Sequence, residues 1–147
     1  MMAIVLDTPT NSDAATVKAY LETEYCVIGK TPFVMRIGIT SEPLALLYKQ
    51  HRTNCAAFIT ACNPFSKIIG NTANIARQEQ LKQELAQRSL TFLDGIGKHP
   101  SNGWPEEPSY LVMALSLEAA KKIGNKFEQN AIVWCDADAI PELILLK

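Results

Sequence analysis

An apolar run of nine residues, NCAAFITAC at 54–62, constrains the fold more than any other stretch of this chain. Side chains of a strand point alternately to opposite faces, yet neither alternating set within this run carries a charge. Strands that are apolar on both faces lie inside sheets that are covered on both sides. Asn63 and Pro64 end the run, because proline cannot donate to a strand ladder. We therefore predict a central strand over 54–62.

Helical and strand-like segments alternate around this run. Spacing and capping residues predict helices at 12–24, after Ser41, at 71–89 and at 116–126. Apolar runs predict further strands at 25–28, 33–37, 90–93, 109–115 and 130–135, with a candidate last strand at 142–147. The glycines and prolines that follow Asp94 predict an irregular loop. The expected fold is a mixed α/β, α+β-like domain over residues 1–147, with one sheet of about five or six strands and helices packed on its faces.

Composition narrows the class of protein. The chain has 14 basic and 15 acidic residues, so its charge gives no field to attract nucleic acid or a membrane surface. No segment approaches the roughly 18 apolar residues of a membrane span, and the first residues lack the basic segment of a signal peptide. Cys55 and Cys62 would lie about 23 Å apart in a strand, too far for a disulfide. We expect a cytoplasmic protein with free thiols.

The helix at 71–89 carries polar residues on its apolar face. At about 100° per residue, Asn74 and Arg77 fall on the same side as Leu81 and Leu85. A buried polar group without a partner costs about 1–3 kcal/mol, so both side chains need company. The start of this helix should lie near the end of the 54–62 strand, where free N–H groups can bind an anion.

Two interpretations of this cluster remain open. In the first, Arg77 forms a site for a small polar or anionic ligand together with Asn63, Ser66 and Asn74. In the second, Arg77 is tied to a carboxylate or to loop carbonyls, and Asn63 and Ser66 are turn and capping residues. The spacing of glycine and lysine here is not that of a Walker loop, and the sequence predicts no cofactor.

Four motifs carry a family resemblance. CAAFITACNPFS, NIARQEQL, WPEEPSYLV and FEQNAIVWCDADAIPEL stand in an order and at spacings that resemble a bacterial family known as domain of unknown function 3293, over residues 17–146. The resemblance implies a small bacterial protein and supplies neither an activity nor a catalytic residue. Together with the helix 71–89 argument, it defines a candidate ligand-binding set: Thr60, Asn63, Ser66, Asn74, Arg77, Trp104, Glu107, Ser109 and Gln129.

Acidic residues suggest two further contacts. Glu107 directly precedes an apolar strand, and we expect it to pair with Arg77 through two parallel hydrogen bonds. Asp136 and Asp138 form a D-x-D that could hold Mg²⁺, although aspartates at this position more often shape a turn. No metal site is predicted.

Other reactive or aromatic residues have ordinary explanations beside functional ones. Cys62 with His99 could act as nucleophile and base, yet a cysteine in an apolar strand is usually a small buried hydrophobe. Trp104 could stack a base or anchor its own loop.

Two functions survive these arguments. The first is a ligand-binding or interaction module with a polar pocket around Arg77. The second is a small hydrolase or phosphoryl-handling enzyme that uses Glu107 or Asp136 with Arg77. The first is preferred because the sequence contains no visible nucleophile–base pair or metal-ligand spacing. Nucleic acid is not an expected partner, and a homo-oligomer remains open.

Overall fold

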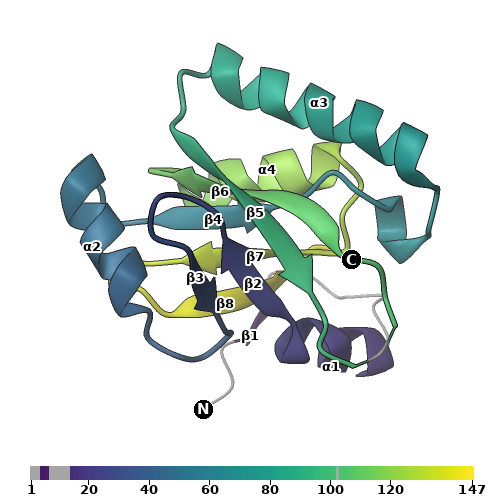
Figure 1. Ribbon diagram of the computed structural model, residues 1–147, viewed down its shortest axis with the longest axis horizontal. Coiled ribbons are helices and arrows are strands. Elements are labelled where there is room, and N and C mark those ends of the chain that lie inside the picture. The colour runs from purple at the N-terminus through teal and green to yellow at the C-terminus, as the bar shows by residue number, and fades with distance from the viewer. Residues whose placement is uncertain (1–3, 7–13, 102) are drawn as a thin grey trace.

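The computed structural model describes residues 4–6, 14–101 and 103–147. The elements of these residues, drawn in Figure 1, follow one another in this order: β1 (Ile4–Leu6), α1 (Ala14–Glu22), β2 (Glu24–Val27), β3 (Phe33–Met35), α2 (Glu42–His51), β4 (Ala56–Ile59), the 3₁₀ turn η1 (Pro64–Ser66), α3 (Asn71–Gln87), β5 (Phe92–Lys98), β6 (Glu107–Met113), α4 (Leu117–Lys126), β7 (Ala131–Cys135) and β8 (Pro141–Leu145). The predicted start of the first helix at residues 12 and 13 lies outside the described residues.

The described strands form one mixed sheet with the order β1-β8-β7-β4-β6-β5-β2-β3. The predicted class, a mixed α/β fold with helices on the faces of a sheet, is confirmed. The expected five or six strands were too few, because the described residues alone contribute eight strands to the sheet. The short N-terminal run Ile4–Leu6 supplies an additional strand, which pairs in parallel with β8. A run of three apolar residues is too short to predict a strand by its own periodicity.

The apolar run at 54–62 forms the interior strand that its pattern predicts. β4 lies between β7 and β6, and its four residues are all buried. The ladder ends at Ile59 because the backbone N–H groups that follow donate to side-chain oxygens instead of a neighbouring strand. The Ala61 N–H donates to Gln78 Oε1 at 3.0 Å, and the Cys62 N–H donates to Thr60 Oγ1 at 3.0 Å.

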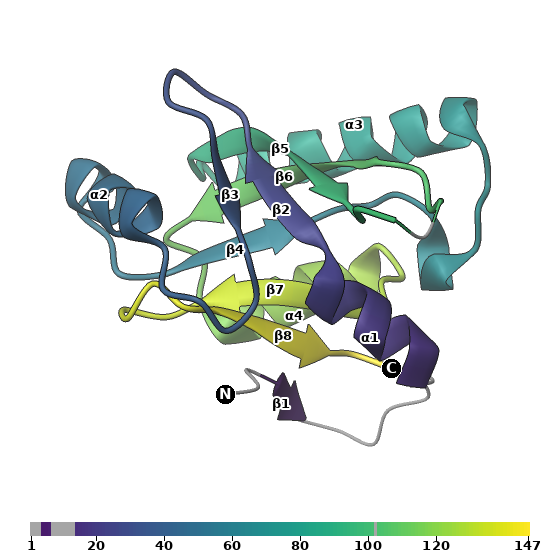
Figure 2. The same ribbon diagram turned by 60° about the horizontal axis from the view of Figure 1, so that its bottom comes forward.

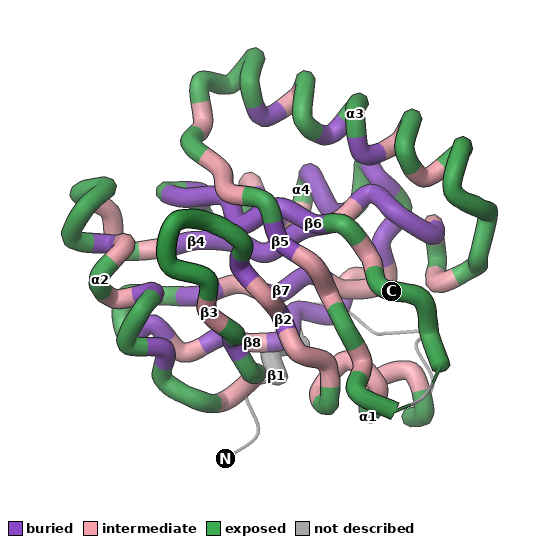
Figure 3. The backbone as a smooth tube through the Cα atoms, in the orientation of Figure 1, coloured by how far each residue is buried: buried purple, intermediate pink, exposed green. Residues whose placement is uncertain are grey.

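Alternation along β4 divides the core into two halves, one on each face of the sheet. Ala57 and Ile59 pack with residues of α3 and α4, whereas Ala56 and Phe58 pack with residues of α2, β2 and β3. Figure 3 shows that burial runs along the inner sides of α3 and α4 and along the central strands. Leu81 and Leu85 of α3 are completely buried and Arg77 is partly buried, so the predicted inward face of this helix is confirmed.

The sheet curls strongly, and the curl creates the space in which a site can form. The rings of Tyr25 on β2 and Phe58 on β4 pack edge to face with centroids 5.4 Å apart, although β5 and β6 lie between their strands in the sheet. Figure 2 shows β2 and β3 crossing over β4. Beyond β3, the N–H groups of Gly38 and Ser41 donate to Pro141 O and Ala139 O, both at 2.9 Å.

Residues 94–98 were expected to be an irregular loop, and that expectation was wrong. β5 runs to Lys98 and pairs with β2 on one side and β6 on the other. The first of its two glycines has a packing role, because a Cβ on Gly95 would lie 2.6 Å from Cε2 of Phe58. A glycine that permits close packing in a strand resembles, in sequence, a glycine that ends one.

The remaining helix signals were correct. Ser41 caps α2 by accepting from Leu44 N, and Ser116 caps α4 by accepting from Ala119 N. None of the helices within the described ranges has both the length and the apolar character that a membrane crossing requires.

Candidate functional site

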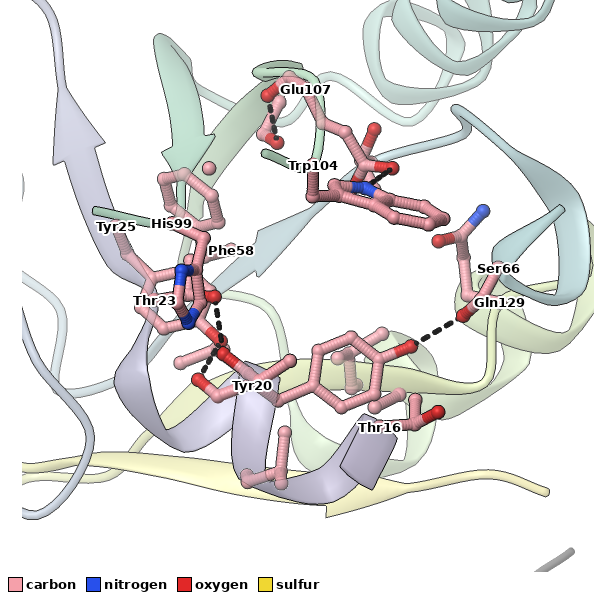
Figure 4. Close-up of a pocket in the computed structure, with 18 of the residues that line it drawn as sticks. Thr16, Tyr20, Thr23, Tyr25, Phe58, Ser66, His99, Trp104, Glu107 and Gln129 are labelled. Atoms are coloured by element: carbon pink, nitrogen blue, oxygen red, sulfur yellow. Dashed lines mark hydrogen bonds between the residues drawn. The ribbon is translucent and has the colours of Figure 1, made fainter. Parts of the chain in front are cut away.

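A cavity of about 330 Å³ lies between α1 and the inner face of the curled sheet. Figure 4 shows side chains from α1, β2, β4 and the β5–β6 connection converging on it. Strand alternation explains its floor: Phe58 and Thr60 lie on one face of β4, and Glu107 and Ser109 lie on the same face of β6 as buried Leu111. The polar end of this face therefore continues directly from its apolar core.

The cavity brings together most of the residues that the sequence suggested. Seven of them contribute to its lining: Thr60, Asn63, Ser66, Trp104, Glu107, Ser109 and Gln129. Asn74 and Arg77 lie outside this lining. Sequence reasoning missed the aromatic walls made by Tyr20, Tyr25 and Phe58, because their convergence depends on the curl of the sheet.

Glu107 is the central polar group of the cavity. Its Oε2 accepts hydrogen bonds from Asn63 Nδ2 at 2.7 Å and from Trp104 Nε1 at 3.2 Å. Its Oε1 accepts none from the described residues and is not completely enclosed. Burial raises the pKa of Glu107, although the hydrogen bonds from Asn63 and Trp104 act in the opposite direction. One carboxylate oxygen is thus held by the protein while the other remains accessible.

Asn74 supports this arrangement from behind the cavity. Asn74 Oδ1 accepts from the Asn63 backbone N–H at 2.8 Å, and Asn74 Nδ2 donates to Asn63 Oδ1 at 2.9 Å. These two bonds fix the orientation of the Asn63 amide, whose Nδ2 then faces Glu107. Asn74 therefore acts on the cavity only through Asn63.

Arg77 does not pair with Glu107, so that prediction was wrong. Its Nε donates to Ala61 O at 2.7 Å, a second guanidinium nitrogen donates to Phe127 O, and a third lies 3.3 Å from Glu128 Oε1. The turn after β4 and the end of α4 leave these two carbonyls without ladder or helix partners. Arg77 satisfies them, as the second interpretation of this cluster expected.

Several donors on the cavity wall are committed to backbone carbonyls. Thr60 Oγ1 donates to Pro108 O at 2.7 Å, and Ser109 Oγ donates to Glu107 O at 3.0 Å. The Tyr25 hydroxyl donates to Tyr20 O at 2.7 Å. Gln129 Nε2 donates to Cys62 O and to Phe127 O, both at 3.1 Å. Because these hydrogens are used, the corresponding side chains present mainly acceptor oxygens to the cavity.

Gln129 illustrates this polarity most clearly. Its side-chain oxygen accepts no hydrogen bond from the described residues, is not completely enclosed, and points toward the cavity in Figure 4. On the neighbouring wall, the hydroxyls of Tyr20 and Ser66 share a hydrogen bond of 2.9 Å, and Asn130 Nδ2 donates to Ser66 Oγ at 2.8 Å. The ring of Tyr20 forms the side of the cavity that α1 contributes.

The alternative catalytic pair, Cys62 with His99, is not assembled. Cys62 is buried, its Sγ donates to Pro108 O at 3.7 Å, and burial raises the pKa of its thiol. A raised pKa is the opposite of what a thiolate nucleophile needs. His99 contacts Glu22 Oε1 through Nε2 at 3.2 Å and accepts from Ser101 N through Nδ1 at 3.1 Å.

The D-x-D motif shapes a turn. Asp136 Oδ1 accepts from Ala137 N at 2.8 Å, and Asp138 Oδ1 accepts from Ile140 N at 3.1 Å. Asp136 follows the end of β7, whereas Arg77 binds Phe127, which precedes the start of β7. Asp136 and Arg77 therefore lie at opposite ends of this strand and do not form a pair. In the part of the chain that the structure describes, three or more His, Cys, Asp or Glu side chains nowhere gather in a way that could hold a metal ion.

Comparison with known proteins gives one match. A family model described as "Protein of unknown function (DUF3293)" matches residues 59–132, slightly more than half of the chain. The matched segment begins at the last residue of β4 and includes α3, β5, β6 and α4, and it contains most of the polar residues around Glu107. Neither a curated protein nor a solved structure matches the chain.

Proposed function

We propose that this chain, which belongs to the family of proteins of unknown function DUF3293, is a small-molecule-binding protein. The ligand would occupy the cavity beneath α1, with Glu107 as its main polar contact. The observation that carries the proposal is a carboxylate held at one oxygen and open at the other within a cavity of about 330 Å³. Small-molecule sites occupy roughly 300–1,000 Å³ and combine apolar walls with a few placed polar groups.

The cavity has both parts of that description. Phe58, Val133 and Leu143 contribute apolar surface, and Glu107 and Gln129 contribute acceptors. Supporting residues keep the polar groups in place, because Asn63 and Trp104 hold the carboxylate. Preorganised polar groups reduce the entropy that binding costs.

The sequence led us to expect a small polar or anionic ligand, and the anionic alternative loses its main support. Arg77, the cation on which it depended, is bound to backbone carbonyls outside the cavity. Lys98 Nζ lies 3.8 Å from Glu106, and His99 contacts Glu22, so both of these lining residues already face carboxylates. Glu107, in contrast, takes part in none of the ion pairs among the described residues.

Blocking the cavity tests the proposal. Ala19 of α1 lines the cavity, and Ala19→Phe would fill it from the helix side; Ala76→Phe on the exposed face of α3 is the matched control. A panel of fragments with an apolar body and a cationic, neutral or anionic head is titrated into ¹⁵N-labelled protein. We expect shifts at the Trp104 indole N–H in the wild type and in Ala76→Phe, and their loss in Ala19→Phe. A panel that binds nowhere, or that binds equally in all three proteins, would refute the proposal.

A second candidate is an enzyme in which Glu107 is a general acid or base. The raised pKa of a carboxyl group in a cavity is the specific observation that favours it. Asp136 would take no part, because its carboxylate shapes the β7–β8 turn. Turnover of ester or phosphate substrates that Glu107→Gln abolishes and Glu106→Gln preserves would support this candidate. Turnover that survives Glu107→Gln would rule out this role.

We also propose a cytoplasmic location. The four cysteines, Cys26, Cys55, Cys62 and Cys135, are free thiols. Proteins with free, partly buried thiols suit a reducing compartment.

A further inference from the structure

We propose that the ligand of this cavity is an organic cation, with a primary ammonium group next to Glu107 Oε1 and an apolar body against the aromatic walls. This inference rests on the proposed function and names the class of molecule for the same site. Three independent properties of the cavity point to it: its hydrogen-bond polarity, its aromatic enclosure and its charge.

Hydrogen-bond polarity comes first. The donor hydrogens of Thr60, Ser109 and Gln129 are used by backbone carbonyls, and the Trp104 N–H is used by Glu107. Glu107 Oε1 and the Gln129 side-chain oxygen still have accepting capacity. A ligand that supplies donors satisfies them, whereas a ligand that supplies acceptors leaves them opposed to its own lone pairs. An ammonium group has three donors and no acceptor.

Aromatic enclosure is the second property. Tyr20, Tyr25, Phe58 and Trp104 all line the cavity, and Figure 4 shows Tyr20 and Trp104 on opposite sides of it. The faces of aromatic rings attract cations, with a gain of about 0.5–2 kcal/mol that is larger in desolvated sites. The same rings also provide the apolar surface for the body of the ligand.

Charge is the third property. Lys98, the lysine among the lining residues, has its own carboxylate, because its Nζ lies 3.8 Å from Glu106 Oε2. The ring of His99 contacts Glu22. None of the ion pairs among the described residues includes Glu107. Burial also raises the pKa of Glu107, which is what a carboxylate without a counter-charge shows. A bound ammonium supplies that counter-charge and makes a charge-assisted hydrogen bond.

Three probes with the same phenylethyl body and different head groups test the class of ligand. They are phenethylamine, 2-phenylethanol and 3-phenylpropanoate, which share a phenylalkyl body and differ in charge. Their affinities are measured by NMR titration at pH 7.5 and low salt. We expect phenethylamine to bind at least about tenfold more tightly than either of the other two, because only the ammonium pairs with Glu107.

Two charge-removing variants assign the effect to one carboxylate. Glu107→Gln keeps an oxygen that can accept from Asn63 and Trp104 and removes the charge. Glu79→Gln removes one negative charge from the exposed surface of α3, which packs on the opposite face of the sheet, and is the control. Glu107→Gln should weaken phenethylamine at least about tenfold and 2-phenylethanol less than about twofold, and Glu79→Gln should weaken either probe less than about twofold.

The outcomes separate this inference from the proposed function. If 2-phenylethanol or 3-phenylpropanoate binds as tightly as phenethylamine, and Ala19→Phe still blocks binding, the cavity binds small molecules but not as a cation site. An unchanged phenethylamine affinity in folded Glu107→Gln has the same meaning. If none of the probes or panel fragments binds, the proposed function itself fails.

Discussion

Arg77 and Glu107 lie near the same end of β4, on opposite faces of the sheet, and the protein uses them differently. Each is partly buried. Arg77 binds Ala61 O, Phe127 O and Glu128, and thereby joins the end of β4 to the end of α4. Glu107 has one oxygen held by Asn63 and Trp104 and one oxygen open to a cavity.

The contrast separates a structural ionic group from one that is available to a ligand. A buried polar group is costly to leave unpaired, so its unused hydrogen-bonding capacity is more informative than its charge. Arg77 has partners for all three guanidinium nitrogens. Glu107 keeps accepting capacity in an aromatic cavity, and this capacity has a cost unless water or a ligand meets it.

The largest expected effect is on the Arg77 side. Arg77→Ala should lower the free energy of unfolding by about 3 kcal/mol, because it leaves Ala61 O without its donor, removes one of the two donors to Phe127 O and breaks the pair with Glu128. Urea unfolding followed by circular dichroism measures this. Glu128→Gln is the control, and it should cost less than about 1 kcal/mol because that pair is exposed on the Glu128 side. Equal effects of the two variants would mean that the ion pair, and not the carbonyl contacts, holds the junction.

A smaller effect is expected under the cavity floor. Gly95→Ala should lower the free energy of unfolding by about 1–3 kcal/mol, because its Cβ would lie 2.6 Å from the Phe58 ring and 3.0 Å from Cys26 O. Gly97→Ala on the same strand is the matched control, since its nearest neighbour would be Glu107 O at 4.0 Å. It should change stability by less than about 0.5 kcal/mol. If Gly95→Ala is as harmless as Gly97→Ala, β5 does not press on Phe58.

The smallest effect is the pH dependence of stability that Glu107 contributes, and the direction of this dependence identifies it. Burial raises the pKa of Glu107 above its unfolded value, so the folded chain keeps this proton to higher pH than the unfolded chain. The contribution of Glu107 to stability is therefore full below the unfolded pKa and falls as the pH rises through the folded pKa. In Glu107→Gln the side-chain amide does not ionise, so this pH dependence should be absent.

Urea unfolding at pH 4 and pH 8, without ligand, measures this difference. The free energy of unfolding of Glu107→Gln minus that of the wild type should be larger at pH 8 than at pH 4. Glu106→Gln, which also removes one negative charge, should not show this dependence. If Glu107→Gln is instead less stable relative to the wild type at pH 8 than at pH 4, the native carboxylate has a counter-charge within the protein.

Periodicity predicted the parts of the fold that depend on local pattern. The uncharged faces of 54–62 placed β4 in the interior, and the spacing of Leu81 and Leu85 turned Arg77 inward. The partner of Arg77 was missed because backbone carbonyls leave no mark in a sequence; Ala61 O and Phe127 O become available only through the way two elements end.

The cavity was predictable in its polar half only. Glu107 was singled out by its position just before an apolar strand, and Asn63 by its position just after one. Tyr20 and Tyr25 were read as members of a helix and a strand, with no indication that they would face Phe58 and Glu107. Their arrival depends on the curl that brings β2 over β4, and strand order and curvature are set by long-range packing.

The contacts of Gly38 and Ser41 with the β7–β8 turn have a consequence for the route by which a ligand reaches the cavity. They fasten the β3 side of the curled sheet to its β8 side at one end, so this end cannot spread apart. The opposite end is bordered by α1, which packs without a single buried residue and shares the Tyr20–Ser66 bond with the wall. A ligand would therefore enter and leave past α1, and its residence time would depend on how often α1 opens locally.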